Sequence, residues 1–203
     1  MGMSAEQKAA WLNARCGVLT ASRVADALGD NGPGKRRKLL MEMLEERTTG
    51  QNYRHMVTPA MEHGLEYEDE MFDVFVERYP QYHVRASRLY MHPRIEYFGA
   101  TPDREVGDDG LLEGKCPSTG TFLDWVLAGV VPEKHKPQMA AQLLCTGRKW
   151  CGFIAYDPRL KDERKRLFLR KFEPTPEYLE TVEAGAVRFL ADLETLFEAY
   201  TTA

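Results

Sequence analysis

The chain has 203 residues, of which 43% are hydrophobic and 29% are charged, a composition typical of one ordinary globular domain. No apolar run approaches the roughly 20 residues that a membrane span needs, and the start of the chain shows no signal-peptide pattern. The net charge of −4 disfavours a surface that binds DNA non-specifically all round, although a locally basic lining is enough to bind phosphates.

The first third of the chain is predicted to be helical. Residues 4–14 form a candidate helix capped by Ser4, and a second helix runs from Arg23 to Leu28 with Thr20 or Ser22 as N-cap. The glycine-rich loop 29–34 precedes a third helix that ends near residue 48. Apolar residues at helical spacing then predict a helix over about 59–79.

Extended segments dominate the middle of the chain, and a long amphipathic helix ends it. We expect strands at 82–91, 95–101, 111–117, 151–156 and 166–172, with helices at 122–129 and 136–145 between the third and fourth strands. Thr175 caps the last helix, about 176–200, and Pro176 begins it. Its buried stripe is expected to contain Leu179, Val182, Ala186, Phe189, Leu193 and Leu196.

This order of elements predicts one α/β domain over residues 1–203, with a central mixed sheet flanked by helices. The helical part spans about 4–80 and the core about 81–173. The four cysteines include no C-x-x-C pair, so the sequence predicts neither a zinc site nor a disulfide framework, and a reducing cytoplasm fits best.

Two short motifs carry most of the chemical information: Thr101-Pro102-Asp103 and, ten residues after Asp103, Glu113-Gly114-Lys115. Strand alternation places Glu113 and Lys115 on one face. The turn 107–110 is expected to bring their strand back alongside the strand 95–100 that leads to Asp103. Neighbouring carboxylates need a cation, and oxygen ligands suit Mg²⁺, so the pattern predicts a metal-dependent phosphodiesterase.

A simpler interpretation is that these charges belong to a solvated turn and an exposed strand face. The apolar neighbours on both sides, Tyr97-Phe98 and Leu111-Leu112, argue instead for a position at the edge of a core.

Six short blocks in the same order resemble the lambda-exonuclease type of viral recombinase nucleases (YqaJ type) within the PD-(D/E)xK superfamily. The similarity spans roughly residues 11–200 and implies a restriction-endonuclease-like core. The blocks are Trp11…Arg15-x-Gly17-Val18-x-Thr20-Ala21-Ser22, Gly64-x-x-Tyr67-Glu68, Thr101-Pro102-Asp103, Leu112-Glu113-Gly114-Lys115-Cys116-Pro117, Gln138-Met139-Ala140-Ala141-Gln142 and Tyr156-Asp157-Pro158-Arg159.

The resemblance implies a two-metal site in which Asp103 bridges two Mg²⁺ ions. Glu113 and the backbone carbonyl of Gly114 would bind one ion and Glu68 the other, and Mn²⁺ accepts the same ligands. Spacing alone favours a surface glutamate in an acidic run for Glu68, and the match to the block Gly64-x-x-Tyr67-Glu68 reverses that preference.

Two further side chains acquire roles in the same site. Lys115 would orient the attacking water and help to deprotonate it, and Gln138 would position the water or the lysine. Gln142 lies one turn after Gln138 on the same helix face, so the residues themselves leave the choice between the two open.

The resemblance also implies contacts to DNA. Arg15, Ser22 and Thr101 would form a pocket for a terminal 5′-phosphate, and Met61 would be a wedge that separates the last base pairs. The basic cluster Lys35–Lys38, with Lys35 and Arg36 as the named contacts, would hold the duplex ahead of the site. The simpler alternatives are helix capping for Ser22, a core methionine and a solvated charge run.

The implied protein is a Mg²⁺-dependent 5′-to-3′ exonuclease that acts on double-stranded DNA ends, releases mononucleotides and leaves 3′ single-stranded tails for phage-type recombination. It would act as a ring-shaped homotrimer with a single-strand annealing protein as partner, in the bacterial host cytoplasm and without a membrane. Two other classes stay open: a related endonuclease or repair nuclease, which would cut closed circular DNA, and a non-catalytic DNA-binding recombination scaffold. The presence of Asp103, Glu113 and Lys115 together argues against the scaffold.

Overall fold

The computed structural model describes residues 13–52 and 59–203, and the side chains of residues 59–65 are not among the groups described. The helix expected at 4–14 lies almost entirely outside these residues. In the part of the chain that is described, no helix has both the length and the apolar character that a membrane span requires.

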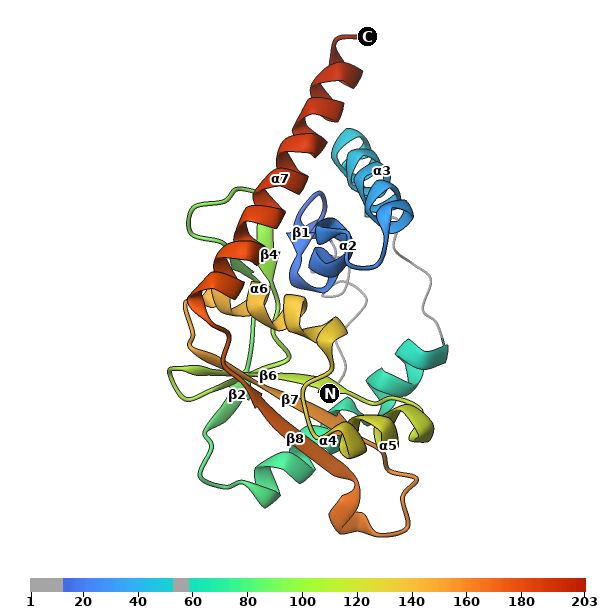
Figure 1. Cartoon of the computed structure of the whole chain (residues 1–203), viewed down its shortest axis with the longest axis vertical. Helices are drawn as coiled ribbons and strands as arrows, with labels where there is room; N and C mark the ends of the chain where they lie inside the picture. Colours follow the sequence, from blue (N-terminus) through green and yellow to red (C-terminus); the bar gives the residue numbers. More distant parts are fainter. Residues whose placement is uncertain (1–12, 53–58) are drawn as a thin grey trace.

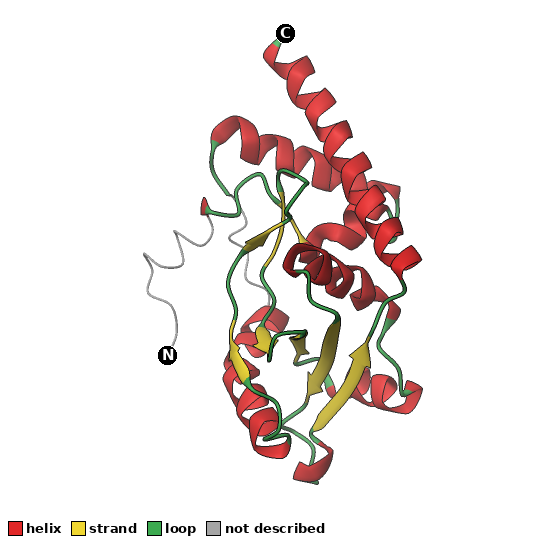
Figure 2. Ribbon diagram, turned by 90° about the vertical axis from the view of Figure 1, so that its left-hand side faces the viewer, coloured by secondary structure: helices red, strands yellow, loops and turns green. Residues whose placement is uncertain are grey.

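A five-stranded mixed sheet forms the lower half of the molecule, and helices flank it, which confirms the predicted fold class (Figures 1 and 2). Strands β6 and β7 pair in parallel, and the other neighbours pair antiparallel. In spatial order the strands are β2 (Val84–Ala86), β5 (Arg104–Val106), β6 (Gly110–Lys115), β7 (Trp150–Tyr156) and β8 (Leu167–Phe172).

A second, three-stranded sheet lies within the helical half of the molecule (Figure 1). Its central strand β4 (Phe98–Ala100) pairs in parallel with β1 (Leu19–Thr20) and antiparallel with β3 (Tyr90–Met91). The single strand expected at 82–91 is therefore wrong: it is two short strands, β2 and β3, that belong to different sheets.

The expected hairpin partner of the Glu113 strand is also wrong. Strand β6 pairs with β5, after Asp103, and not with the segment before Asp103, which is β4 of the small sheet. Pro102 has no backbone N–H to continue a ladder, so the chain leaves one sheet there and enters the other. As a result, Asp103 lies where the two sheets meet.

The helices begin and end close to the expected positions. They are α2 (Val24–Leu28), preceded by a 3₁₀ turn (Ala21–Arg23), α3 (Pro33–Thr49), α4 (Pro59–Arg78), α5 (Thr119–Ala128), α6 (Lys136–Thr146) and α7 (Pro176–Thr201). Thr175 caps α7 by accepting a 3.3 Å hydrogen bond from the N–H of Tyr178, as predicted. Thr20 occupies the N-cap position of the 3₁₀ turn, but its side chain makes no capping bond, and Ser22 lies within that turn.

Helix α6 lies between the helical layer and the large sheet and contributes to the core on both sides (Figure 1). Ala140 and Ala141 face α7 and the small sheet, whereas Met139 and Leu143 pack on β6 and β7. The predicted stripe of α7 is buried at its centre, but Leu196 is 36% exposed because the end of α7 extends beyond the body. The buried position of α6 brings its polar side chains to the strands.

Candidate active site

Asp103 lies on the segment that leaves β4 and enters β5. Its Oδ2 atom accepts a 2.8 Å hydrogen bond from the backbone N–H of Gly114, so the carboxylate is held against β6. Burial raises the pKa of Asp103 to about 8, and the negative charges of Glu113 and Glu68 add to the rise. The ionised form of Asp103 is therefore costly unless a cation lies beside it.

Glu113 is fully buried, and three side chains donate hydrogen bonds to its carboxylate. Lys115 and Gln138 donate to Oε1, with the Gln138 nitrogen at 2.6 Å, and Gln142 donates to Oε2. Burial lowers the pKa of Lys115, but the charges of Glu113 and Asp103 outweigh burial and raise the pKa above its ordinary value. Lys115 is therefore an ammonium in this geometry.

The structure shows that both glutamines of α6 contact the same carboxylate. Gln138 is partly exposed, whereas Gln142 is fully buried and its Oε1 lies 3.7 Å from the Cys151 sulfur. Sequence reasoning assigned a role to Gln138 and left Gln142 open. The signal was their separation by four residues, which places both on one helix face, but only the packing of α6 shows that this face meets Glu113.

Glu68 is close enough to raise the pKa of Asp103, but its carboxylate is paired with Arg104. The distance from Arg104 Nη1 to Glu68 Oε1 is 3.2 Å. Sequence reasoning did not single out Arg104, since a basic residue after a turn has no distinctive pattern.

The donor atoms fit a hard divalent cation. Among the described residues, no three His, Cys, Asp or Glu side chains already form a metal-type cluster. Asp103 and Glu113 nevertheless place two carboxylates in one site, and burial together with the negative charge of Glu113 raises the pKa of Asp103 although Lys115 acts to lower it. A set of carboxylate and carbonyl oxygens without nitrogen or sulfur suits Mg²⁺ or Mn²⁺.

Of the three residues expected to bind a terminal phosphate, Ser22 and Thr101 follow two parallel strands, whereas Arg15 precedes the first of these strands. Ser22 comes shortly after β1 and Thr101 directly after β4, so both lie at the same edge of the small sheet. Ser22 is exposed, and its Oγ lies 3.4 Å from Thr20 Oγ1. Thr101 Oγ1 is buried and has no hydrogen-bond partner among the described residues. This edge adjoins Asp103, two residues after Thr101.

The other residues expected to contact DNA are Arg36, Lys35 and Met61. Arg36 pairs with Asp192 at 2.6 Å and donates to the carbonyl of Ala27, so it joins α3 to α7 and α2. Lys35 is exposed at the start of α3. Met61 falls among the side chains outside the described groups.

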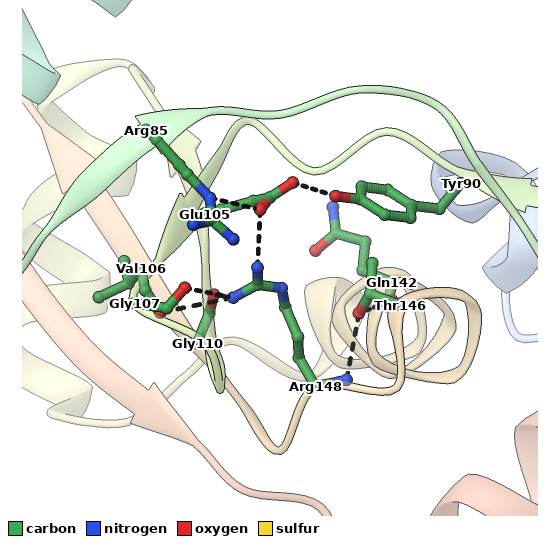
Figure 3. A network of polar contacts seen from close by, with 9 residues as sticks. All are labelled: Arg85, Tyr90, Glu105, Val106, Gly107, Gly110, Gln142, Thr146 and Arg148. Carbon is green, nitrogen blue, oxygen red and sulfur yellow. Dashed lines mark hydrogen bonds and ion pairs between the residues drawn. The ribbon is translucent and has the colours of Figure 1, made fainter.

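A polar network fixes the β5–β6 hairpin behind the site (Figure 3). Glu105, which is 3% exposed, accepts hydrogen bonds from Arg85, Tyr90 and Arg148. Arg148 also donates to the carbonyls of Gly107 and Gly110 at 3.0 and 2.8 Å. Because Tyr90 belongs to the small sheet and Glu105 to the large one, the network holds together the two sheets between which Asp103 lies.

The glycine between Glu113 and Lys115 lets α4 approach β6. A Cβ atom at position 114 would lie 2.1 Å from the Met71 methyl carbon and 3.1 Å from Phe72 Cζ. We expect Gly114→Ala to lower the free energy of unfolding by about 1–3 kcal/mol, because a filled core must shift to accept it. Urea unfolding measures this change, and Gly120→Ala in α5, where a Cβ would meet nothing within 4 Å, is the matched control. Equal stability of the two variants would contradict the close approach.

Comparisons with known proteins show which family the chain resembles. The YqaJ-like viral recombinase domain matches residues 10–149. The alkaline exonuclease LHK-Exo from Laribacter hongkongensis is 35% identical over 95% of this chain and 96% of its own, with a TM-score of 0.88. Its complex with dAMP gives a TM-score of 0.89 at the same identity and coverage.

A phage-related exonuclease from Haemophilus somnus 129PT has a TM-score of 0.68 over 90% of this chain and 96% of its own, but at 9% identity it shows only a shared fold. No curated protein sequence matches. The recombinase domain covers more than half of the chain, and the alkaline exonuclease covers nearly all of it. This chain therefore belongs to the family of YqaJ-like viral recombinase domains, with the alkaline exonuclease fold of the PD-(D/E)xK type.

Proposed function

We propose that this protein is a Mg²⁺-dependent exonuclease that degrades the 5′-ended strand at double-stranded DNA ends. It releases mononucleotides and leaves a 3′ single-stranded tail for annealing in phage recombination. The observation that carries the proposal is the buried Glu113 carboxylate, held by Lys115 and two glutamines beside Asp103. The family and the related alkaline exonuclease support a nuclease of phage recombination.

The dAMP complex of LHK-Exo supports the expected product. A deoxynucleoside monophosphate bound to that exonuclease is the type of molecule that stepwise removal of single nucleotides releases. The ring-shaped homotrimer and the annealing partner remain part of the proposal through the family resemblance alone.

Each residue of the site has a distinct task in this proposal. Asp103, Glu113, the carbonyl oxygen of Gly114 and Glu68 would hold the divalent cations. Cations bound there supply Lewis acidity, which acidifies water and offsets phosphate charge. Lys115, as an ammonium, orients the attacking water and stabilises negative charge on the scissile phosphate. Gln138 and Gln142 keep the Glu113 carboxylate in one orientation.

The decisive experiment is digestion of linear duplex DNA with 5′-phosphates in Mg²⁺, with labels at either the 5′ or the 3′ ends. We expect 5′-labelled mononucleotides from the first time point, while the 3′ label stays on the surviving strands. Closed circular DNA should remain intact, and EDTA should stop the reaction. Cleavage of the circle would favour the endonuclease, and binding without cleavage would favour the scaffold.

The proposed phosphate pocket predicts a difference between two kinds of DNA end. Arg15→Ala should slow digestion of 5′-phosphorylated ends by about 10- to 100-fold, since a hydrogen bond to a charged group contributes about 1.5–3 kcal/mol. Ends with a 5′-hydroxyl should be affected much less. Initial rates on both substrates measure the effect, and Arg188→Ala on the exposed face of α7 is the charge control. An equal loss on both ends would show that Arg15 does not bind the end phosphate.

A further inference from the structure

The side chain of Arg104 is held by contacts on several sides. Its Nη1 atom donates to the backbone oxygen of Asp103 at 2.8 Å and lies 3.2 Å from Glu68 Oε1. Its Nη2 atom lies 3.4 Å from Asp69 Oδ1, and the guanidinium carbon lies 4.3 Å from the centre of the Phe72 ring. The Arg104 side chain is only 23% exposed, so solvent screens its charge less than that of a surface arginine.

This placement affects one of the carboxylates expected to bind cations. Of the three carboxylates expected to bind cations, Asp103 and Glu113 lie together. Glu68 instead forms an ion pair with the guanidinium of Arg104. In the part of the chain that is described, no group of three such side chains is assembled. A divalent cation that uses Glu68 must therefore approach a guanidinium of the same sign.

We propose that Arg104 competes with a divalent cation for Glu68, so that the second metal ion binds only when Glu68 gives up this ion pair. The site then loads in order: the ion held by Asp103, Glu113 and Gly114 binds first, and the ion that needs Glu68 binds last and more weakly. This inference rests on the proposed function, because it takes Glu68 as a metal ligand.

The pocket beside Arg104 offers other acidic side chains that its guanidinium could pair with after it leaves Glu68. Arg104 lines an open pocket of about 420 Å³ between α4 and the neighbouring strands β2 and β5. Asp69 and Asp73 line the same pocket. A guanidinium released from Glu68 thus keeps acidic neighbours, which makes the exchange less costly than a transfer into an apolar environment.

The test is Mn²⁺ binding to the protein without DNA, measured by calorimetry and by the electron paramagnetic resonance signal of free Mn²⁺. Wild-type protein should show one stronger and one weaker binding step. Arg104→Met, which keeps an apolar stem over Phe72 without the charge, should tighten only the weaker step, by about 10-fold, equivalent to about 1.4 kcal/mol. Arg104→Lys should restore weak binding.

Two controls identify the steps. Glu68→Gln should remove the weaker step alone, and Arg164→Met, at an exposed arginine that pairs with Asp162, should change neither step. Thermal unfolding of each variant establishes that it is folded. Weaker or unchanged binding in Arg104→Met would overturn the competition, as would equal tightening of both steps.

The same measurements separate this inference from the proposed function. If wild-type protein binds Mn²⁺ in two steps and digests DNA ends, but Arg104→Met leaves the second step unchanged, only the role of Arg104 is wrong. If wild-type protein neither binds Mn²⁺ nor digests DNA, the proposed nuclease itself is wrong.

Discussion

Asp103→Asn is expected to lower DNA cleavage by on the order of 10³-fold or more. The substitution removes the carboxylate charge that both cations would share. This should lower the rate more than the removal of one neutral hydrogen-bond donor from an active site, which costs about 10²- to 10³-fold. The shape is conserved, and the amide can still accept the hydrogen bond from Gly114. Single-turnover digestion of linear duplex measures the loss, and cleavage within tenfold of wild type would contradict the two-metal assignment.

The same variant should be more stable than wild type when no metal is present. The pKa of Asp103 rises from an ordinary 3.8 to about 8 in the folded protein, so the folded state binds this proton more tightly than the unfolded state. As pH rises from 4 to 8, ionisation favours the unfolded state, and the wild-type free energy of unfolding falls. Asparagine does not titrate and removes this loss.

The stability difference is measurable by thermal unfolding in EDTA across this pH range. Asp103→Asn and wild type should unfold at similar temperatures near pH 4, and by pH 8 the variant should gain at least the roughly 2–4 °C that 1 kcal/mol produces in a domain of this size. A constant difference across the range would contradict the raised pKa. A stable but inactive variant also excludes unfolding as the cause of lost cleavage.

Lys115→Met is expected to lower cleavage by about 10²- to 10⁴-fold, the range that a positioned proton-transfer or charge-stabilising group contributes. It should also destabilise the fold, because Glu113 is fully buried and loses its only paired cation among the described residues. Removing one partner of a buried pair costs about 3–5 kcal/mol, and the 31% exposure of Lys115 favours the lower end.

A double variant separates the two effects. Glu113→Gln combined with Lys115→Met removes both charges of the Glu113–Lys115 pair and should recover most of the lost stability, whereas cleavage should stay low. Lys149→Met, at a lysine that is 73% exposed and pairs with Asp109, is the matched control and should be near wild type in both assays. Because Glu113→Gln also removes an expected metal ligand, recovery of cleavage in the double variant would show that neither Glu113 nor Lys115 takes part in the chemistry.

Much of the site can be predicted from sequence because its residues are set by local rules. Alternation along β6 places Glu113 and Lys115 on one face, and helical spacing places Gln138 and Gln142 together. Thr175 and Pro176 mark the start of α7 for equally local reasons, since capping involves atoms within one turn.

Strand pairing is where local rules fail. The segment 82–91 has the pattern of one strand, yet its halves join different sheets because each half pairs with a partner far away in sequence. The predicted pairing of the Glu113 strand with the segment before Asp103 is wrong for the same reason. An extended segment shows no local sign of which neighbour will hydrogen-bond to it.

The sequence by itself therefore marked Asp103, Glu113 and Lys115 as candidate site residues and indicated the α/β class, because spacing and residue chemistry act over a few positions. Their proposed roles came from the family resemblance. Tertiary packing decided the rest: that both α6 glutamines bind Glu113, that Ser22 and Thr101 share a sheet edge, and that Arg104 pairs with Glu68. Glu113 and Gln138 are 25 residues apart in the sequence, and Glu68 and Arg104 are 36 residues apart. At that separation only the folded chain determines which charges and dipoles face each other.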